Sequence, residues 1–320
     1  MNDQWPARPP QNPGDTEARA PLDIEQFSAS SDRPGTPETD AHEEPGAGVL
    51  YVVSTPIGNL KDITLRAIEV LRTVDLIACE DTRKSGILLQ TLGVPANRVS
   101  LHRFSESRKT SSLLRHLKNG EHVALITDAG TPGISDPGAR LVRAALEAGF
   151  RVVPIPGPSA VTAALSVSGM EAQTFTFLGF APRTDDQRRT FFRQIRDRGA
   201  TAIFFETPKR ILRTLSIAQD VLGESRITVM RELTKVHEEI LTGTPASIMQ
   251  TLQARAAIKG EFIITVQGRK EEAPAVDLDR IVKDLITEGF TGKKLADEAR
   301  KRFGVKKAAA YDRFLKIAGK

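Results

Sequence analysis

The 320-residue chain carries 45 lysines and arginines against 40 acidic residues, a net charge of +5, and 40% of its residues are hydrophobic. This composition is typical of a globular protein, and the length allows two or three domains. No apolar run approaches the roughly 18 residues of a membrane-spanning helix, so no membrane association is predicted. The single cysteine, Cys79, excludes a disulfide framework and favours a reducing, cytoplasmic compartment.

The first 46 residues differ in composition from the rest of the chain. They hold ten acidic and three basic side chains and eight of the 19 prolines, and their apolar residues are few and scattered. Such a composition is typical of a disordered tail, and it lacks the apolar segment of a signal peptide. Because this tail has a net charge of −7, the remaining residues carry +12, which favours a polyanionic partner such as nucleic acid.

From residue 47 the pattern alternates between strands and helices. Apolar runs predict strands at 49–53, 74–79, 99–102, 124–126 and 151–155, each followed by a predicted helix. Apolar runs without polar alternation are typical of strands that are buried on both faces of a parallel sheet. Residues 47–172 are therefore predicted to form an α/β domain.

Three polar loops with glycine leave the carboxyl ends of these strands, and their sequences are STPIGNL (54–60), TDAGTPGISDPG (127–138) and PGPSA (156–160). Open α/β sheets bind ligands at this edge, where glycines such as Gly130 and Gly133 allow close approach to the backbone. The alternative is a set of tight turns, with Ser135 or Asp136 capping the helix from Ala139. Neither a G-x-G-x-x-G fingerprint nor a P-loop is present.

Charged side chains also follow several strands. Carboxylates there can act as a general base, and cations can hold phosphates. Exposed charged caps are the alternative, and the sequence does not single out one base. No metal site is predicted, because the HEE sequence at 237–239 lacks the second histidine of H-E-x-x-H. The candidates for proton removal or substrate positioning are Glu80, Asp81, Arg83, Glu206, Lys209, Arg231 and Glu232.

Residues 173–268 are predicted to form a second α/β domain, with strands at 174–180, 201–205, 226–230, 238–242 and 262–266. The fourth of these strands is predicted to pair with the third. Residues 269–320 comprise a charged linker and three helices at about 279–288, 292–303 and 306–317. A dense basic cluster around one connection, without an obvious neutralising acidic block, predicts a helix-turn-helix-like nucleic-acid module, and a solvated helical cap is the alternative. The cluster contains Lys293, Lys294, Arg300, Lys301, Arg302, Lys306 and Lys307.

Seven motifs occur in order between residues 48 and 268: YVVSTPIGNLKDITLRA, CEDTR, TDAGTPGISDPG, PIPGPSA, ETPKR, RELTKVHEE and GEFIITV. Together they resemble the tetrapyrrole methylase superfamily, and within it the enzymes that methylate a cytidine 2′-hydroxyl of 16S ribosomal RNA. The basic helical tail resembles their C-terminal helix-turn-helix domain, whereas the first 46 residues lie outside the resemblance. STPIGN replaces the Gly-x-Gly-Pro-Gly loop of the tetrapyrrole-modifying relatives, which argues against a porphyrinoid substrate.

The resemblance implies a two-domain class III methyltransferase fold, with S-adenosylmethionine bound in the cleft between the domains. It implies 16S ribosomal RNA within the small ribosomal subunit as the partner, and it leaves a homodimer open. A small-molecule methylase of the tetrapyrrole type and a non-catalytic RNA-binding assembly factor are the alternatives. The first leaves the basic tail unexplained, and the second leaves the three loops without a purpose. The positions implied to contact the methyl donor are Pro56, Gly58, Asp128, Ala129, Gly130, Thr131, Ser159, Ala160, Leu178, Met230 and Glu261.

Overall fold

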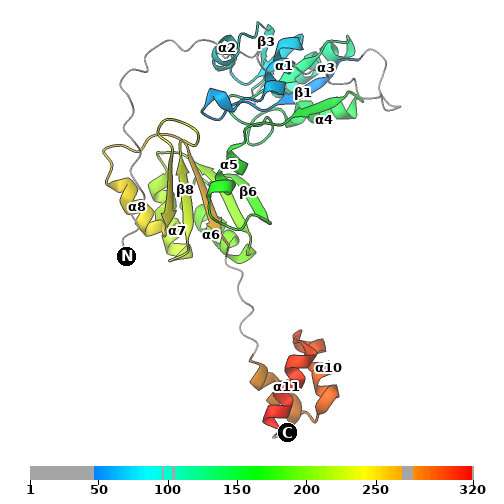
Figure 1. Ribbon diagram of the computed structural model, residues 1–320, viewed down its shortest axis with the longest axis vertical. Coiled ribbons are helices and arrows are strands. Elements are labelled where there is room, and N and C mark those ends of the chain that lie inside the picture. Colours follow the sequence, from blue (N-terminus) through cyan, green and yellow to red (C-terminus); the bar gives the residue numbers. More distant parts are fainter. Residues whose placement is uncertain (1–46, 96, 103–104, 269–276, 319–320) are drawn as a thin grey trace. The chain divides into compact units, whose positions relative to one another are not determined.

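The computed structural model describes residues 47–95, 97–102, 105–268 and 277–318 (Figure 1). The predicted tail at 1–46 and most of the predicted charged linker lie outside these ranges. The chain divides into two compact units. One runs up to Val167 and includes Met230–Ile240, and the other combines Ser168–Val229 with Leu241–Lys320.

The first unit is built on a five-stranded sheet with the order β3-β2-β4-β1-β5, and all four strand pairings are parallel. The predicted parallel sheet is therefore confirmed. Parallel order places the carboxyl ends of the strands, and the loops that follow them, at one edge. The strands are β1 (Leu50–Val53), β2 (Leu76–Cys79), β3 (Asn97–Ser100), β4 (Val123–Leu125) and β5 (Val152–Ile155).

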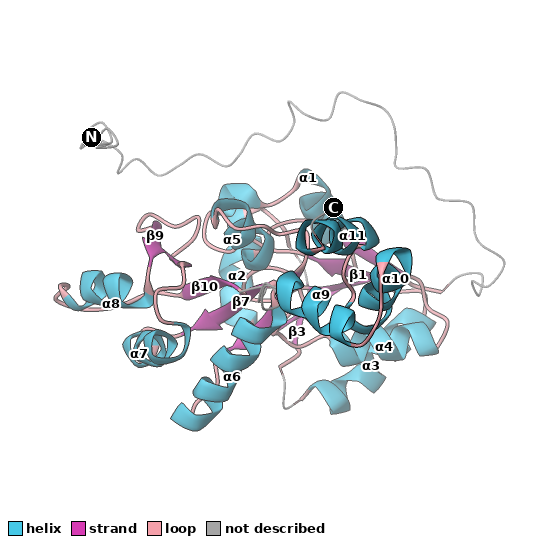
Figure 2. Cartoon of the chain, turned by 90° about the horizontal axis from the view of Figure 1, so that it is seen from below, coloured by secondary structure: helices cyan, strands magenta, loops and turns pink. Residues whose placement is uncertain are grey.

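Helices cover both faces of this sheet because successive side chains of each strand point to opposite sides. Ala124 of β4 packs in the cluster that contains α1 (Leu65–Thr73) and α2 (Thr82–Thr91). The next residue, Leu125, packs on the other face against α3 (Glu106–Lys118) and α4 (Ala139–Glu147). Figure 2 shows α1 and the α3–α4 pair on opposite sides of β1. A fifth helix, α5 (Ala160–Val167), follows β5.

The predicted caps of α4 are wrong. Neither Ser135 nor Asp136 caps this helix, whose N-cap is Gly138 and has no side-chain cap of its own. Instead, Oε1 of Glu106 on α3 accepts hydrogen bonds from the backbone N–H groups of Gly138 and Arg140, both at 3.0 Å. A carboxylate on the neighbouring helix has replaced the local cap, which the local sequence could not reveal.

A short 3-10 helix separates the first predicted loop, residues 54–60, from the start of α1. Asn59 caps a short 3-10 helix at Leu60–Asp62, where its side chain accepts a hydrogen bond from the backbone of Lys61. The cap of α1 is Thr64, whose hydroxyl accepts a hydrogen bond from the backbone N–H of Ala67 at 3.1 Å. The loop after β1 is therefore longer and more structured than expected.

The second unit contains a mixed sheet with the order β6-β7-β10-β8-β9, in which β6 and β7 are parallel and β10 is antiparallel to β7. The strands β8 and β9 are neighbours, as predicted. Phe192, Phe204 and Phe262 are central to its core. Its elements are β6 (Phe175–Phe180), α6 (Asp185–Arg198), β7 (Thr201–Glu206), α7 (Ile211–Leu222), β8 (Ile227–Arg231), β9 (Glu239–Gly243), α8 (Pro245–Gln253) and β10 (Phe262–Gln267).

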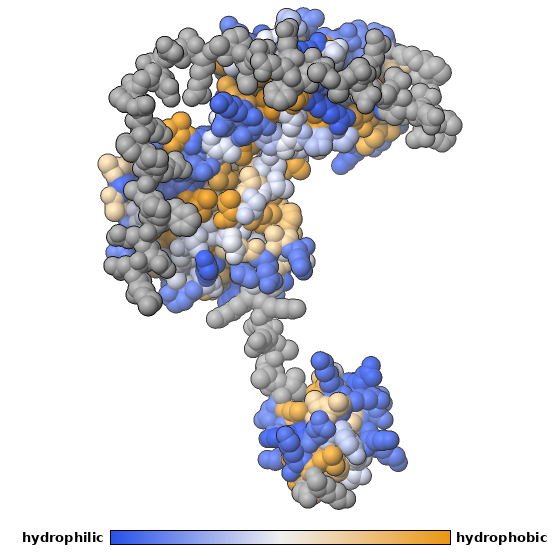
Figure 3. Space-filling model, viewed as in Figure 1, coloured by the Kyte–Doolittle hydropathy of each residue, from blue (hydrophilic) through white to orange (hydrophobic). Residues whose placement is uncertain are grey.

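The last three helices, α9 (Leu278–Thr287), α10 (Gly292–Phe303) and α11 (Lys307–Ile317), form a cluster with its own small core. On the face shown in Figure 3 they present mostly hydrophilic residues. In the described part of the chain, no helix is long and apolar enough to cross a membrane.

The predicted basic cluster on these helices is only partly confirmed. The connection between α10 and α11 is flanked by Arg300, Lys301, Arg302, Lys306 and Lys307, whereas Lys293 and Lys294 lie in the first turn of α10. Acidic residues also neutralise two of them. Arg302 pairs with Glu288 and Glu298, each at 2.6 Å, and Lys307 pairs with Asp297. Helical spacing indicates the i,i+4 pair of Arg302 with Glu298, but it could not show the pairs of Arg302 with Glu288 and of Lys307 with Asp297.

Candidate functional site

The structure brings the loops after β1 and β4 together at the carboxyl edge of the first sheet. Thr55 and Gly130 form an antiparallel bridge, with N···O distances of 2.9 and 3.0 Å. The Thr55 hydroxyl also donates to the carbonyl of Thr127 at 3.0 Å. Gly130 has a φ of 83°, which explains why glycine is suited to this position.

The loop after β5 is tied into the same arrangement through Thr131. The hydroxyls of Ser54 and Thr131 lie 2.9 Å apart, and the Thr131 hydroxyl donates to the carbonyl of Pro158 at 3.3 Å. The following residue, Ser159, accepts a hydrogen bond from the backbone of Ala163 in the first turn of α5, which begins at Ala160. The three loops predicted to act together are therefore neighbours.

The first loop also contacts Met230–Ile240, which belongs to the same compact unit. A Cβ atom on Gly58 would lie 2.4 Å from Cγ of Lys235 and 2.8 Å from Oγ1 of Thr234, so only glycine fits there. The backbone N–H of Asn59 donates to that Thr234 hydroxyl at 3.1 Å. In this structure Gly58 thus permits a close contact between two protein segments, while the neighbouring Pro56 is buried.

The segment between β8 and β9 is strained and held by hydrogen bonds. Glu232 and Thr234 adopt positive φ angles of 52° and 66°, which non-glycine residues rarely do. Glu232 pairs with Lys235 at 3.0 Å, and the backbone N–H of Thr234 donates to Oε2 of Glu238 at 2.6 Å. Arg231 lies 4.0 Å from Glu239. Such strain concentrates at functional sites, which keeps Glu232 and Arg231 among the candidates.

Asp128 joins the loop after β4 to the start of α2. Its Oδ1 accepts a hydrogen bond from the backbone N–H of Asp81 at 3.2 Å, and its Oδ2 pairs with Nζ of Lys84 at 2.8 Å. The side chain of Asp128 remains 21% exposed, and that of Lys84 is 67% exposed. Asp81 itself caps α2, and its hydrogen bonds with Arg83 hold the pKa of its carboxyl below the usual range. A partly exposed carboxylate with one exposed cationic partner is available to a ligand.

Two further carboxylates surround the hydroxyl of Thr127. This hydroxyl donates to Oε2 of Glu80 at 3.2 Å. Burial raises the pKa of Asp136 to about 6; a hydrogen bond from Thr127 opposes the shift, and the negative charges of Glu80 and Asp128 add to it. Asp136 was predicted only as a cap, because its burial and its acidic neighbours come from contacts distant in the sequence.

Glu206, at the end of β7, occupies a different environment, in the second unit. It is buried, and its two oxygens accept hydrogen bonds from the backbone of Thr207 at 2.7 Å, Nε of Arg210 at 2.8 Å and the hydroxyl of Thr214 at 2.7 Å. Nη2 of Arg210 lies 2.7 Å from the same carboxylate. This saturated network favours a structural role over proton removal.

The remaining candidates occupy varied positions. Leu178 lies inside β6, where the pairing with β7 is irregular between Phe177 and Phe180. Met230 is fully buried near the end of β8. Glu261 is exposed directly before β10, and Lys209 is exposed after β7. Ala129 is exposed beside Asp128, where a ligand can reach it.

Known proteins are similar to this chain over most of its length. The sequence model of the tetrapyrrole (corrin/porphyrin) methylase family matches residues 49–248 of this chain. A protein named ribosomal RNA small subunit methyltransferase I from Mesorhizobium japonicum is 43% identical over 283 residues, which are 88% of this chain and 96% of that protein. Its namesake from Escherichia coli O157:H7 is 44% identical over 278 residues, covering 85% and 96%.

A solved structure shows a similar fold. The crystal structure of a diphthine synthase aligns with a TM-score of 0.55 and 15% identity, covering 69% of this chain and 90% of that one. At this identity the likeness concerns the fold alone. The sequence matches go further: this chain belongs to the tetrapyrrole (corrin/porphyrin) methylase family and is a methyltransferase that uses S-adenosylmethionine.

Proposed function

We propose that this protein transfers a methyl group from S-adenosylmethionine to the 2′-hydroxyl of a cytidine in 16S ribosomal RNA, acting on the small ribosomal subunit in the cytoplasm. The observation that carries the proposal is the match to proteins named ribosomal RNA small subunit methyltransferase I, at 43–44% identity over nearly their whole length. The basic character of residues 47–320 supports a polyanionic substrate.

The loops at the carboxyl edge of the first sheet have the chemistry to hold the methyl donor. The hydroxyls and the ammonium group of the donor need backbone polar groups and a carboxylate, which the exposed Ala129 and the partly exposed Asp128 offer. When bound there, S-adenosylmethionine supplies the electrophilic methyl group. The bridge between Thr55 and Gly130 fixes the loop before any ligand arrives, so little ordering accompanies binding.

A ribose hydroxyl is a weak nucleophile, so transfer is aided by a group that takes its proton. The carboxylates around Thr127 are the candidates in the first unit. Asp136, whose pKa is about 6, is suited to exchange a proton near neutral pH. Alignment of the hydroxyl lowers the barrier more than the base does. Orientation can supply roughly 7–11 kcal/mol. General base catalysis accelerates a reaction about 10²–10⁴-fold, which corresponds to roughly 3–5 kcal/mol.

The test is a methylation assay with the full chain and methyl-labelled S-adenosylmethionine. One arm contains small ribosomal subunits that lack the modification, and the other contains porphyrinogens. We expect label only in the ribosomal RNA, in a dinucleotide that resists alkaline hydrolysis, because a 2′-O-methyl group blocks cleavage of the adjacent phosphodiester. Label on a base or on a porphyrinogen would contradict the proposal, and binding of RNA without label would favour an assembly factor.

A further inference from the structure

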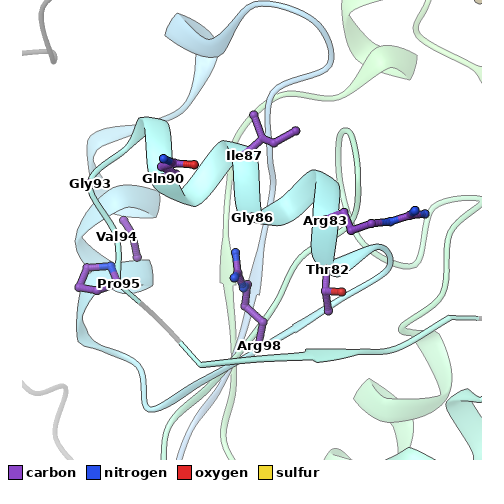
Figure 4. Close-up of a pocket in the computed structure, with 9 residues that line it drawn as sticks. All are labelled: Thr82, Arg83, Gly86, Ile87, Gln90, Gly93, Val94, Pro95 and Arg98. Atoms are coloured by element: carbon purple, nitrogen blue, oxygen red, sulfur yellow. The ribbon is translucent and has the colours of Figure 1, made fainter.

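A groove of about 840 Å³ lies on the first unit between α2 and the segment that leads into β3 (Figure 4). It contains two arginines and no carboxylate. By contrast, a groove of about 570 Å³ beside α4, on the opposite face of the sheet, contains both Glu106 and Glu147. The first groove is thus suited to an anion. Its lining residues are Thr82, Arg83, Gly86, Ile87, Gln90, Gly93, Val94, Pro95 and Arg98.

One of the two arginines, Arg98, places its guanidinium against the backbone of α2 at a glycine. Figure 4 shows Arg98 reaching from β3 toward Gly86 in the middle of α2. A Cβ atom on Gly86 would lie 2.5 Å from Nη1 of Arg98, so the missing side chain makes room for the guanidinium. Glycine within a helix is destabilising relative to alanine, which indicates that the space has a use. In the described part of the chain, no acceptor or acid pairs with Arg98.

The same face of α2 supplies further groups for nucleic acid. Positions 83, 87 and 90 are three and four residues apart and so share one face of the helix. The side chain of Arg83 is 89% exposed, and Asp81 orients its guanidinium through Nε at 3.3 Å and Nη2 at 3.2 Å. Ile87 is 69% exposed, and Gln90 offers an amide. Two cations flanking an exposed apolar side chain suit phosphates and bases on one strand.

We propose that this groove binds the sugar–phosphate backbone of the single-stranded ribosomal RNA beside the target nucleotide, with Arg98 and Arg83 contacting phosphates. The proposal rests on the proposed function. Continuity with the candidate site supports it, because Asp81, which directly precedes α2, donates its backbone N–H to Asp128. From that point α2 extends over ten residues, or about 15 Å, so it can guide a strand toward the loops.

The test compares Arg98→Glu with Arg143→Glu, an exposed arginine of α4 on the opposite face of the sheet. Affinity for a 16S ribosomal RNA transcript is measured at two salt concentrations, and affinity for S-adenosylmethionine is measured by calorimetry. We expect Arg98→Glu to weaken RNA binding about tenfold or more and to lower the salt slope by at least about 0.7, the value for one phosphate on a single strand. Arg143→Glu should change neither, and donor affinity should stay unchanged in both.

A second variant, Gly86→Ala, tests the cradle without removing a charge. The new methyl group displaces the guanidinium of Arg98, so RNA affinity should fall a few-fold while the helix becomes no less stable.

If the wild type binds and methylates RNA but Arg98→Glu binds it equally well, the groove proposal is overturned and the proposed function stands. If the wild type neither binds nor methylates ribosomal RNA, the proposed function itself fails. A change in molecular mass on sedimentation of Arg98→Glu, with unchanged RNA affinity, would assign the groove to a second copy of the chain and overturn the proposal.

Discussion

Two carboxylates at the carboxyl ends of buried strands, Glu206 at the end of β7 and Asp128 after β4, have different surroundings. Glu206 is buried and saturated by Arg210, Thr207 and Thr214. Asp128 is partly exposed and has a lysine partner whose side chain is itself 67% exposed. A charge at a strand end therefore marks a sheet edge, and its partners decide whether it stabilises the fold or is available to a ligand.

The largest effect is expected at Glu206. Glu206→Gln removes the buried counter-charge of the half-buried Arg210 guanidinium, so the free energy of unfolding should fall by about 3 kcal/mol. Urea denaturation measures this change. Glu147→Gln is the control, because this exposed residue lies at the end of α4 and should change stability by less than about 0.5 kcal/mol. If the Glu206 variant and the control variant were equally stable, Glu206 would not stabilise the fold, and its contrast with Asp128 would be lost.

A smaller, pH-dependent effect is expected at Asp136. Burial raises its pKa from 3.8 to about 6, so the folded protein holds this proton more tightly than the unfolded chain. Its contribution to stability therefore decreases as the pH rises between these values, and above pH 6 its charge is a cost. Asp136→Asn should raise the free energy of unfolding at pH 8 by up to about 2 kcal/mol, after allowance for solvent screening, and much less at pH 4. Urea curves at both pH values test this, and a stabilisation confined to pH 4 would refute it.

The smallest effects concern the C-terminal helices, where the same contrast between paired and unpaired charges applies. Lys301 is exposed, and no acid among the described residues pairs with it. Lys301→Ala should weaken 16S ribosomal RNA binding a few-fold and lower the salt slope by about 0.7.

Arg302 pairs with two glutamates, and its guanidinium lies 5.4 Å from the centre of the Phe290 ring. Arg302→Ala should therefore lower the stability only slightly, because exposed ion pairs contribute little, and leave RNA affinity nearly unchanged. The opposite ranking in RNA affinity would show that pairing does not decide which cations bind.

The sequence predicted the strands and helices well because their signals are local. The apolar run at 124–126 and the glycine-rich loop after it correspond to β4 and the turn at Gly130, within about one residue. The parallel order followed from alternating strands and helices. The convergence of the three loops also followed, because parallel strands place their carboxyl ends at one edge.

The predictions that failed depended on partners distant in the sequence. Glu106 caps α4 from 32 residues away, and Asp136 gains its raised pKa from burial and from Glu80 and Asp128. Gly58 also has neighbours distant in the sequence, because its missing side chain makes room for Thr234 and Lys235, and its contact with the methyl donor stays a prediction. Local patterns identify which residues can do chemistry, whereas tertiary contacts decide which are free to do it.

The central claim is that the loops at the carboxyl edge of the first sheet hold the methyl donor through Asp128. Calorimetry of S-adenosylmethionine binding to Asp128→Ala tests it, with Glu147→Ala, an exposed acid on α4, as the control. We expect Asp128→Ala to weaken binding by about 1–3 kcal/mol, since the polar groups of the donor lose their partner, and Glu147→Ala to bind as the wild type does. Circular dichroism verifies that both variants are folded. Wild-type affinity in a folded Asp128→Ala protein would contradict the claim and leave Asp128 as the link between two loops.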